Sequence, residues 1–360
     1  MTPNARSAVA CRVSEQVLKR SLHAIKIEND LLSATVLLDK GADIYELIYK
    51  PRRMDVLWKT PWGLREQARG VATAPDSATV WLENYAGGWQ VLFPNGGDEC
   101  IYKGVALNFH GEASTTAWDC QIVTQGPDAA EVRLYTRLYR SPFRIERTMR
   151  VEKGRPILTI GERVTNEGNE PLDYMWGHHP ALGAPFLSGA CRIDVGARAL
   201  LADDAYVGAA NPLQPGRRYA WPAAEVDGAT LDLSLVPGRG ATRDLMAYFS
   251  DFESGWFAVT NCELGFGFGL TWPAEVFPYA WFWQELQASG GFPFYKGAYT
   301  MAIEPFSSVP GQGLVAVMQK TGTQRSLAAG QSAEVTLRAV LYESTSGVRE
   351  ISPDGTVRVK

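Results

Sequence analysis

Residues 130–166 read AEVRLYTRLYRSPFRIERTMRVEKGRPILTIGERVTN, and this stretch decides the fold. Runs rich in β-branched and aromatic residues predict β-strands, while short Gly- and Pro-containing segments between such runs predict turns. The stretch holds three runs of this kind, at 130–139, 143–152 and 156–166. Three successive strands with short connections favour an antiparallel sheet.

The middle run alternates in the way that a half-exposed antiparallel strand does. Ile145, Met149 and Val151 fall on one face and charged or polar residues fall on the other. Arg147 is the exception, because its position places it on the apolar face.

The same strand chemistry recurs along most of the chain, at 32–39, 42–49, 255–262, 299–306 and 333–343. One short helix is predicted, from a cap at Ser14 to Leu22. The segment 198–240 is rich in Ala, Gly and Pro and is predicted to be an excursion from one sheet. We therefore expect an all-β protein built as one large antiparallel β-sandwich with few short helices.

Composition limits the functions that this chain can have. The 35 basic and 39 acidic residues give a net charge of −4, which argues against a nucleic-acid surface. No run reaches the ~18 apolar residues of a spanning helix, and the N-terminus lacks the pattern of a secretory signal. The scattered, odd-numbered cysteines indicate buried thiols in a reducing cytoplasm, with no disulfide framework or zinc site. They are Cys11, Cys100, Cys120, Cys191 and Cys262.

Three of the four histidines fall in two places in the sequence. His110 lies in LNFHGE, and His178 and His179 lie in WGHHPALG, whereas His23 is isolated in a polar segment and is expected at the surface. Adjacent residues of a strand point to opposite faces, so only one of His178 and His179 can face a given cleft. This argues against one metal ion bound by both.

Glu304 is the carboxylate that stands apart, in the apolar run MAIEP. A carboxylate in such a run is expected to be partly desolvated, which raises its pKa toward that of a useful general base. An edge-strand glutamate in solvent is the alternative.

The segment FPYAWFWQEL, 277–286, sets apolar rings beside amide and carboxylate groups. Such a combination suits a sugar, because rings pack on C–H faces while polar groups bind hydroxyls; plain core packing is the alternative. The sugar-binding candidates are Trp281, Trp283, Gln284 and Glu285.

The nearby alternation GFGFG, 265–269, places three glycines on one strand face, which leaves room for a ligand or for close sheet packing. Motifs of other enzyme classes are missing from the sequence. It has no GxSxG elbow, no GxGxxG and no Walker motif. Glycosidase chemistry needs two carboxylates. Glu304 with Glu285 or Asp98 could supply them, but nothing in the sequence fixes their spacing.

Taken together, these segments resemble the aldose 1-epimerase (galactose mutarotase-like) superfamily, as a divergent bacterial branch, from about residue 28 to 345. The resemblance is carried by four segments in the family's order. They are LLSATVLLDKGADIYELIY at 31–49, FPNGGD at 93–98 with LNFHGE at 107–112, VTN at 164–166 before GHHP at 177–180, and AIEP at 302–305.

The resemblance implies a galactose mutarotase-like supersandwich over 28–345, with an N-terminal arm (1–27) and a C-terminal tail (346–360). It also implies interconversion of the α and β anomers of a free sugar without metal or cofactor. Glu304 would take the proton of the anomeric hydroxyl, His179 would protonate the ring oxygen and His110 would hydrogen-bond the sugar. Because the two histidines are adjacent, His178 is the alternative acid. Asn95, Asp98 and His178 would join the substrate-binding set.

The chain departs from the family where members carry an arginine beside the first asparagine and a His-x-Tyr-Phe segment, so the resemblance does not name the sugar. Two other functions stay open: a metal-assisted sugar isomerase or lyase on the same scaffold, and a non-catalytic carbohydrate-binding protein. The expected partner is a small sugar, with no nucleic acid and no membrane. Either a monomer or a homodimer is compatible with the sequence.

Overall fold

The computed structural model describes residues 11–360 except 20, 66–75, 207 and 209. Strands dominate it, and all the strand pairs that it describes between named strands are antiparallel. The strands of the first half are β1 (Arg12–Leu18), β2 (Leu22–Glu28), β3 (Leu32–Leu37), β4 (Asp43–Tyr49), β5 (Met54–Asp55), β6 (Trp89–Leu92), β7 (Cys100–Tyr102), β8 (Val105–Leu107), β9 (Asp119–Gln125), β10 (Ala129–Arg137), β11 (Phe143–Glu152), β12 (Ile157–Asn166), β13 (Leu172–Tyr174) and β14 (Gly177–Gly183).

The second half continues with strands and adds a short helix. Its strands are β15 (Cys191–Ala202), β16 (Arg218–Ala220), β17 (Ala223–Val226), β18 (Ala229–Asp232), β19 (Arg243–Asn261), β20 (Phe266–Trp272), β21 (Tyr279–Leu286), β22 (Tyr299–Phe306), β23 (Arg325–Leu327), β24 (Ser332–Glu343), β25 (Val348–Ile351) and β26 (Val357–Val359). The helical elements of the described residues are a 3-10 turn (Lys50–Arg52), α1 (Ser77–Asn84) and α2 (Leu314–Lys320).

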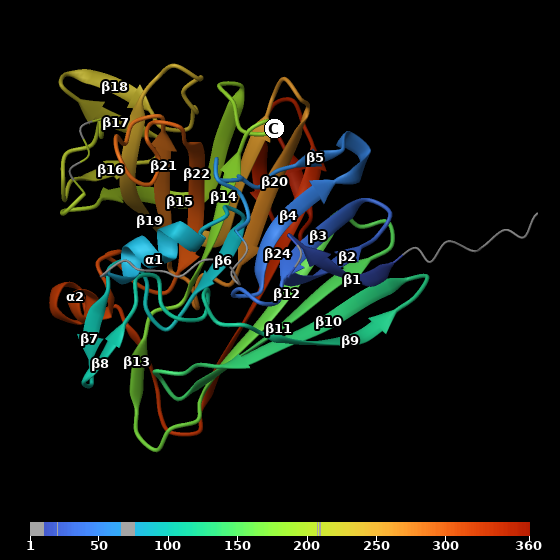
Figure 1. Ribbon diagram of the computed structural model, residues 1–360. Helices are drawn as coiled ribbons and strands as arrows, with labels where there is room; N and C mark the ends of the chain where they lie inside the picture. Colours follow the sequence, from blue (N-terminus) through green and yellow to red (C-terminus); the bar gives the residue numbers. More distant parts are fainter. Residues whose placement is uncertain (1–10, 20, 66–75, 207, 209) are drawn as a thin grey trace, which may run out of the picture.

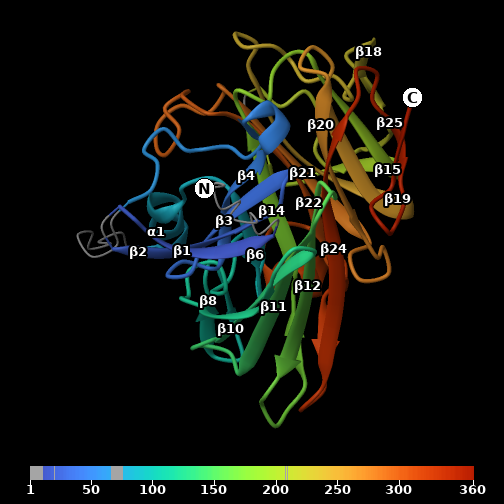
Figure 2. The same cartoon turned by 90° about the vertical axis from the view of Figure 1, so that its right-hand side faces the viewer.

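The long strand β19 joins two layers of one sheet. Its first half, from Arg243 to Phe249, pairs with β21, whereas its second half, from Gly255 to Asn261, pairs with β20. From β20 the pairing continues through β24, β12, β11 and β10 to β9. From β21 it continues through β22, β14, β6, β4, β3 and β2 to β1, and the two directions are visible in Figures 1 and 2.

The inward-facing residues of both layers form one large apolar core. Within β11 the buried positions alternate with partly exposed ones, as the sequence pattern predicts. Arg147 is buried on the core face and pairs there with Glu162 of β12, Nε to Oε1 at 2.6 Å. The prediction of an all-β antiparallel sandwich is confirmed.

The helix predicted from Ser14 to Leu22 is wrong. Residues 12–18 and 22–28 form the hairpin β1–β2, in which Leu18 pairs with Leu22. Burial of Ala24, Ile25 and Ile27 against the sandwich outweighs the local capping signal at Ser14. The expected arm therefore supplies two strands of the sheet.

The expected C-terminal tail is also part of the folded structure. It forms the hairpin β25–β26, and Val348 and Ile351 pack in a small core with Trp256 and Tyr342. The segment 198–240 leaves the main sheet only in part. It ends β15 and forms β16, which pairs with β15 in the main sheet, and then forms the separate hairpin β17–β18.

The glycines of β20 serve close packing. A Cβ on Gly267 would lie 2.3 Å from the Tyr342 ring, and one on Gly269 would lie 2.2 Å from Ile351. All five cysteines are free thiols, with Cys11 and Cys191 buried. Neither helix in the described part of the chain has the length and apolarity to cross a bilayer.

Candidate active site

Strands β14 and β22 bring His179 and Glu304 together. Their register pairs Gly177 with Phe306 and Ala181 with Ala302, so that His179 lies opposite Glu304. Oε1 of Glu304 is 3.7 Å from Nε2 of His179, and both side chains are buried. Close approach of these strands depends on Gly177, because a Cβ there would lie 2.1 Å from the Phe306 ring.

The environment of Glu304 is that of a desolvated carboxylate. Its residue is 2% exposed, and Oε2 has no hydrogen-bond partner among the described residues. Burial raises the pKa of Glu304 well above its usual range, because the charged form loses its hydration. The expectation of a desolvated carboxylate at this position is met.

The two adjacent histidines separate onto opposite faces of β14. His179 lines a pocket, while His178 is fully buried in the core, where its Nδ1 accepts a hydrogen bond from Nε1 of Trp89 at 3.1 Å. Nε2 of His178 lies 3.3 Å from Oε2 of Glu162, the carboxylate that also pairs with Arg147 in the core. The expectation that His178 binds substrate is therefore corrected, since the strand alternation turns it away from the pocket.

His179 carries little positive charge at neutral pH. Burial lowers its pKa to about 4, because the imidazolium would lose its hydration. Nδ1 of His179 has no hydrogen-bond partner among the described residues. The ring lies edge-on to Tyr85, with centroids 5.7 Å apart, and 5.6 Å from the ring of Trp283.

His110 reaches the same pocket from a loop between β8 and β9. The backbone N–H of Gly97 donates to its Nδ1 at 3.0 Å, and the backbone N–H of His110 donates to the Gly97 carbonyl at 2.9 Å. Because Nδ1 accepts, Nε2 carries the ring proton and is a hydrogen-bond donor. Burial, followed by the charge of His179, lowers the pKa of His110 well below its usual range. The ring centroids of the two histidines are 5.9 Å apart.

The pocket that these three residues share has a volume of about 300 Å³. Asp98 lies in its lining, and no Lys or Arg occurs among its described lining residues. Large aromatic side chains are the commonest lining residues: Trp81, Tyr85, Phe109, Tyr206, Trp281, Trp283 and Phe294. Such a site combines apolar faces with a few polar groups, as sugar sites do.

Three other predicted binding residues lie outside this pocket. Asn95 is fully buried and holds its own loop, because its amide donates to the carbonyls of Asp98 and Asn108. Gln284 faces away from Trp281 and Trp283 and packs on Met301. Glu285 shares their face but accepts hydrogen bonds from the backbone N–H groups of residues 288 and 289. These three expectations are corrected: the structure gives each side chain a structural partner.

Four wall residues carried no signal that sequence reasoning used. Trp81 and Tyr85 are four residues apart at the end of α1, so that they share a helix face, and this spacing could have marked them. Tyr206 comes from the segment between β15 and β16, and Phe294 from the loop between β21 and β22. Their placement depends on how these segments fold back over the sheet.

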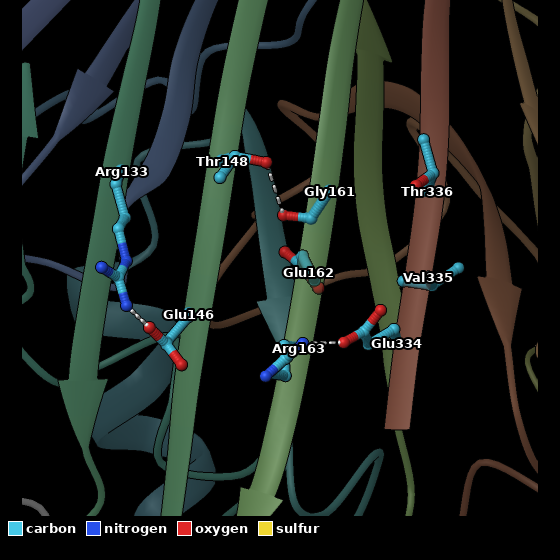
Figure 3. A pocket seen from close by; sticks show the side chains of 9 residues that line it. All are labelled: Arg133, Glu146, Thr148, Gly161, Glu162, Arg163, Glu334, Val335 and Thr336. Carbon is cyan, nitrogen blue, oxygen red and sulfur yellow. Dashed lines mark hydrogen bonds and ion pairs between the residues drawn. The ribbon is translucent and has the colours of Figure 1, made fainter. Parts of the chain in front are cut away.

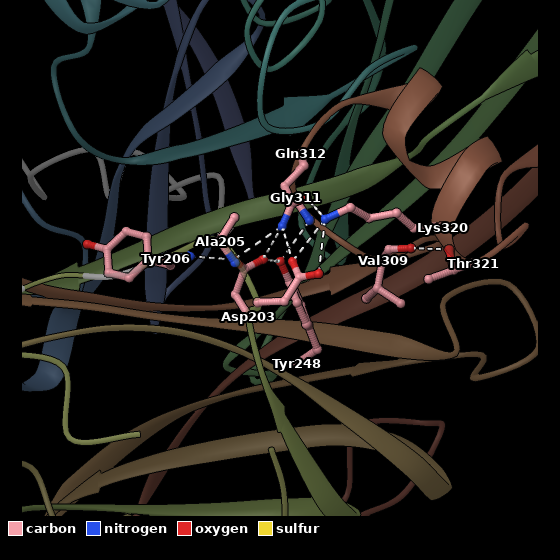
Figure 4. A network of polar contacts seen from close by, with 10 residues as sticks. Asp203, Ala205, Tyr206, Tyr248, Val309, Gly311, Gln312, Lys320 and Thr321 are labelled. Atoms are coloured by element: carbon pink, nitrogen blue, oxygen red, sulfur yellow. Dashed lines mark hydrogen bonds and ion pairs between the residues drawn. The ribbon is translucent and has the colours of Figure 1, made fainter. Parts of the chain in front are cut away.

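A buried carboxylate, Asp203, holds the backbone segment that carries Tyr206, which lines the pocket (Figure 4). Its Oδ1 accepts the backbone N–H groups of Ala205 and Tyr206, each at 2.7 Å, and its Oδ2 accepts the Tyr248 hydroxyl. Gln312 Nε2 donates to both oxygens of Asp203, and Gln312 also pairs with the Gly97 backbone. Through Gln312, the segment that carries Tyr206 is thus connected to the Gly97 loop that orients His110.

A larger hollow of about 430 Å³ lies on the outer face of β10, β11, β12 and β24 (Figure 3). Its charged side chains pair across neighbouring strands, Arg133 with Glu146 and Arg163 with Glu334. These pairs leave no unpartnered acid or base at the centre of the hollow, in contrast to the Glu304 pocket. Within the described chain, no three His, Cys, Asp or Glu side chains gather as a metal ion would need.

A family model described as a domain of unknown function (DUF4432) matches residues 19–341. The chain belongs to the DUF4432 family. Comparison of the sequence with curated proteins gives no match. The part of this DUF4432 chain that the model matches runs from the hairpin β1–β2 to the end region of strand β24, and so contains all the lining residues of the pocket.

The fold of this DUF4432 member is galactose mutarotase-like. It is similar to a proposed aldose 1-epimerase from Klebsiella pneumoniae, with a TM-score of 0.67 and 16% identity over 93% of this chain and 85% of that one. It is also similar to a galactose mutarotase-like protein from Clostridium acetobutylicum, with a TM-score of 0.65 and 14% identity over 93% and 99%. A third, from Lactobacillus casei, has a TM-score of 0.59 and 18% identity over 89% and 100%.

Proposed function

We propose that the protein is an aldose 1-epimerase that interconverts the α and β anomers of a free sugar. The observation that carries this proposal is the placement of Glu304 and His179 opposite one another, each with an unpartnered buried atom, in an aromatic pocket. Anomer exchange needs a base and an acid on two neighbouring oxygens, and no other chemistry. The fold shared with the aldose 1-epimerase and mutarotase-like structures supports the same proposal.

The proposed reaction starts from the charged form of the pair, with Glu304 as a carboxylate and His179 as an imidazolium. Glu304 takes the proton from the anomeric hydroxyl while His179 gives one to the ring oxygen. The bond between C1 and the ring oxygen breaks, and C1 becomes an aldehyde. The C1–C2 bond rotates, and the ring oxygen attacks the other face of C1. His179 then recovers its proton and Glu304 returns the one that it took, so that atoms and charge balance.

Burial disfavours the charged form of each group, so the reactive form is the minor one in the free protein, but each group is more reactive in it. A carboxylate whose pKa is raised is a stronger base once ionised, and an imidazolium whose pKa is lowered is a stronger acid. In this proposal Nε2–H of His110 donates to a substrate oxygen, since its Nδ1 already accepts a hydrogen bond from Gly97. The proposed substrate is therefore bound by donors and acceptors among stacked rings.

The test is anomer exchange followed by NMR on a panel of freshly dissolved free sugars, with the uncatalysed rate subtracted. Glu304→Gln keeps the shape of the side chain and removes the base, so we expect exchange to slow by roughly 10²-fold or more. Glu334→Gln, on the outer face, is the matched control and should keep the rate. Equal rates for Glu304→Gln and the parent would sink the assignment. Sugar binding without exchange by the parent protein would instead indicate a carbohydrate-binding protein.

A further inference from the structure

The phenol ring of Tyr85 is fixed against the proposed acid–base pair. Tyr85 is the C-terminal cap of α1 and is 1% exposed. Its ring stacks on Trp81, with centroids 4.6 Å apart and planes at 27°, and meets His179 edge-on at 89°. A third ring, Trp58, lies 5.8 Å away. With neighbours on three sides, the ring has a single position in which to present its hydroxyl.

The hydroxyl of Tyr85 has no hydrogen-bond partner among the described residues. Within that part of the chain it is the one tyrosine hydroxyl that is both buried and unpartnered. Tyr248 shows the usual arrangement, since its hydroxyl donates to Asp203 and accepts the Gly311 N–H at 2.8 Å. A buried polar group that stays unpaired destabilises a protein, so an unpaired one in a pocket calls for an external partner.

The surroundings make the Tyr85 hydroxyl a donor. Burial, followed by the charges of Glu304 and Asp43, raises its pKa well above its usual range, so that it keeps its proton. Glu304 Oε2 and His179 Nδ1 are the other unpartnered buried atoms of the pocket lining. The pocket therefore offers one neutral donor next to the pair that is proposed to act on the anomeric carbon.

We propose that the Tyr85 hydroxyl contacts the substrate and donates a hydrogen bond to a sugar hydroxyl beside the anomeric carbon. This inference rests on the proposed function and adds a residue that orients the sugar. A structural role is the competing explanation. Gln90 Oε1 and Asp43 Oδ1 are also buried and unpartnered, and a water molecule that joined them to Tyr85 would satisfy all three groups.

Two tyrosine-to-phenylalanine variants separate these explanations, because each removes a single oxygen. Tyr85→Phe deletes an unpartnered hydroxyl, so we expect an unchanged or higher melting temperature and a kcat/KM roughly tenfold lower, the size of one neutral hydrogen bond. Tyr248→Phe deletes a paired hydroxyl and should lower the melting temperature. A Tyr85→Phe variant that loses stability as Tyr248→Phe does, or that keeps the parent kcat/KM, overturns the inference.

A panel of monodeoxy sugars then identifies the contacted hydroxyl. The parent protein should discriminate against one deoxy sugar by about the factor that Tyr85→Phe loses, and Tyr85→Phe should not discriminate against that sugar further. If the parent exchanges no anomers, the proposed function fails, and calorimetric sugar binding becomes the readout. Weaker binding by Tyr85→Phe would then support the contact, whereas equal affinity, or no binding by the parent, would reject it.

Discussion

Glu304 and His179 face each other across β22 and β14, with Oε1 and Nε2 3.7 Å apart and the other polar atom of each side chain unpartnered among the described residues. Burial shifts the two pKa values in opposite directions, up for Glu304 and down for His179. Both shifts favour the uncharged forms of the pair. A substrate that places two oxygens at this pair gives each group a proton-transfer partner.

The two adjacent histidines should respond to substitution in opposite ways. His179→Asn removes the proposed acid from the pocket, so we expect at least a hundredfold slower exchange with little change in unfolding free energy. His178→Asn breaks core contacts to Trp89 and Glu162 and should cost about 1–3 kcal/mol of stability. Urea unfolding and NMR exchange on both variants check this. The idea fails if His178→Asn is the variant that loses activity at full stability.

The free energy of unfolding should decrease at acid pH because His179 is buried in its neutral form. Its pKa is 6.5 in the unfolded chain and about 4 in the folded one, so between these values the unfolded state binds the proton more readily. Folding stability from this group therefore falls as the pH drops from 6.5 to 4, by about 3 kcal/mol in total. Urea unfolding at several pH values, in a Glu304→Gln background that removes the neighbouring titration, should show this slope. Adding His179→Asn should abolish it.

The buried pair of Arg147 and Glu162 should matter for stability alone. Glu162 is 3% exposed, and although burial alone would raise its pKa, Arg147 and His178 lower it to about 2. Its contribution to stability is therefore complete above pH 4.5 and lost toward pH 2. Glu162→Gln leaves the Arg147 charge buried without a carboxylate and should cost about 3–5 kcal/mol. Arg163→Gln on the outer face is the control, expected to cost less than 1 kcal/mol. Equal losses in thermal unfolding would contradict this account.

Arg147 also illustrates which features of the fold the sequence can predict and which it cannot. The two-residue alternation of 143–152 predicts β11 and marks Arg147 as out of place on an apolar face. It cannot name Glu162 as the partner, because the register of β11 on β12 arises from packing of the whole sheet. For the same reason the capping signal at Ser14 predicted a helix where pairing with β2 imposes a strand.

Some residues of the candidate site can be identified from the sequence, whereas others depend on how distant segments fold. Local sequence identifies Glu304 as a desolvated carboxylate, and the family resemblance singles out His179 and His110. The alternation within β21 could have predicted that Gln284 faces away from Trp283. The backbone N–H groups that donate to Glu285 belong to a loop whose path the sequence does not reveal. Tyr85 and Tyr206 were missed because a helix and a long excursion must first fold back over the sheet before their rings reach the pocket.

The Asp203 network should control substrate affinity more than chemistry. An amide at this position keeps one oxygen for the backbone N–H groups of Ala205 and Tyr206, but its NH2 group cannot accept from the Tyr248 hydroxyl or from Gln312. Asp203→Asn therefore loosens the contacts that hold the segment of Tyr206. We expect KM to rise several-fold while kcat stays within about twofold, since His179 and Glu304 keep their strands. Steady-state anomer exchange gives both constants.

The neighbouring Asp204 is the matched control for that substitution. Its side chain is 52% exposed and pairs with Lys320 at 3.0 Å, and an exposed pair of this kind contributes less than about 1 kcal/mol. Asp204→Asn should leave KM and the melting temperature near those of the parent, although it belongs to the same cluster of polar contacts. A rise in KM as large as that of Asp203→Asn would show that the charge of the cluster, and not the set of hydrogen bonds that Asp203 accepts, sets the affinity.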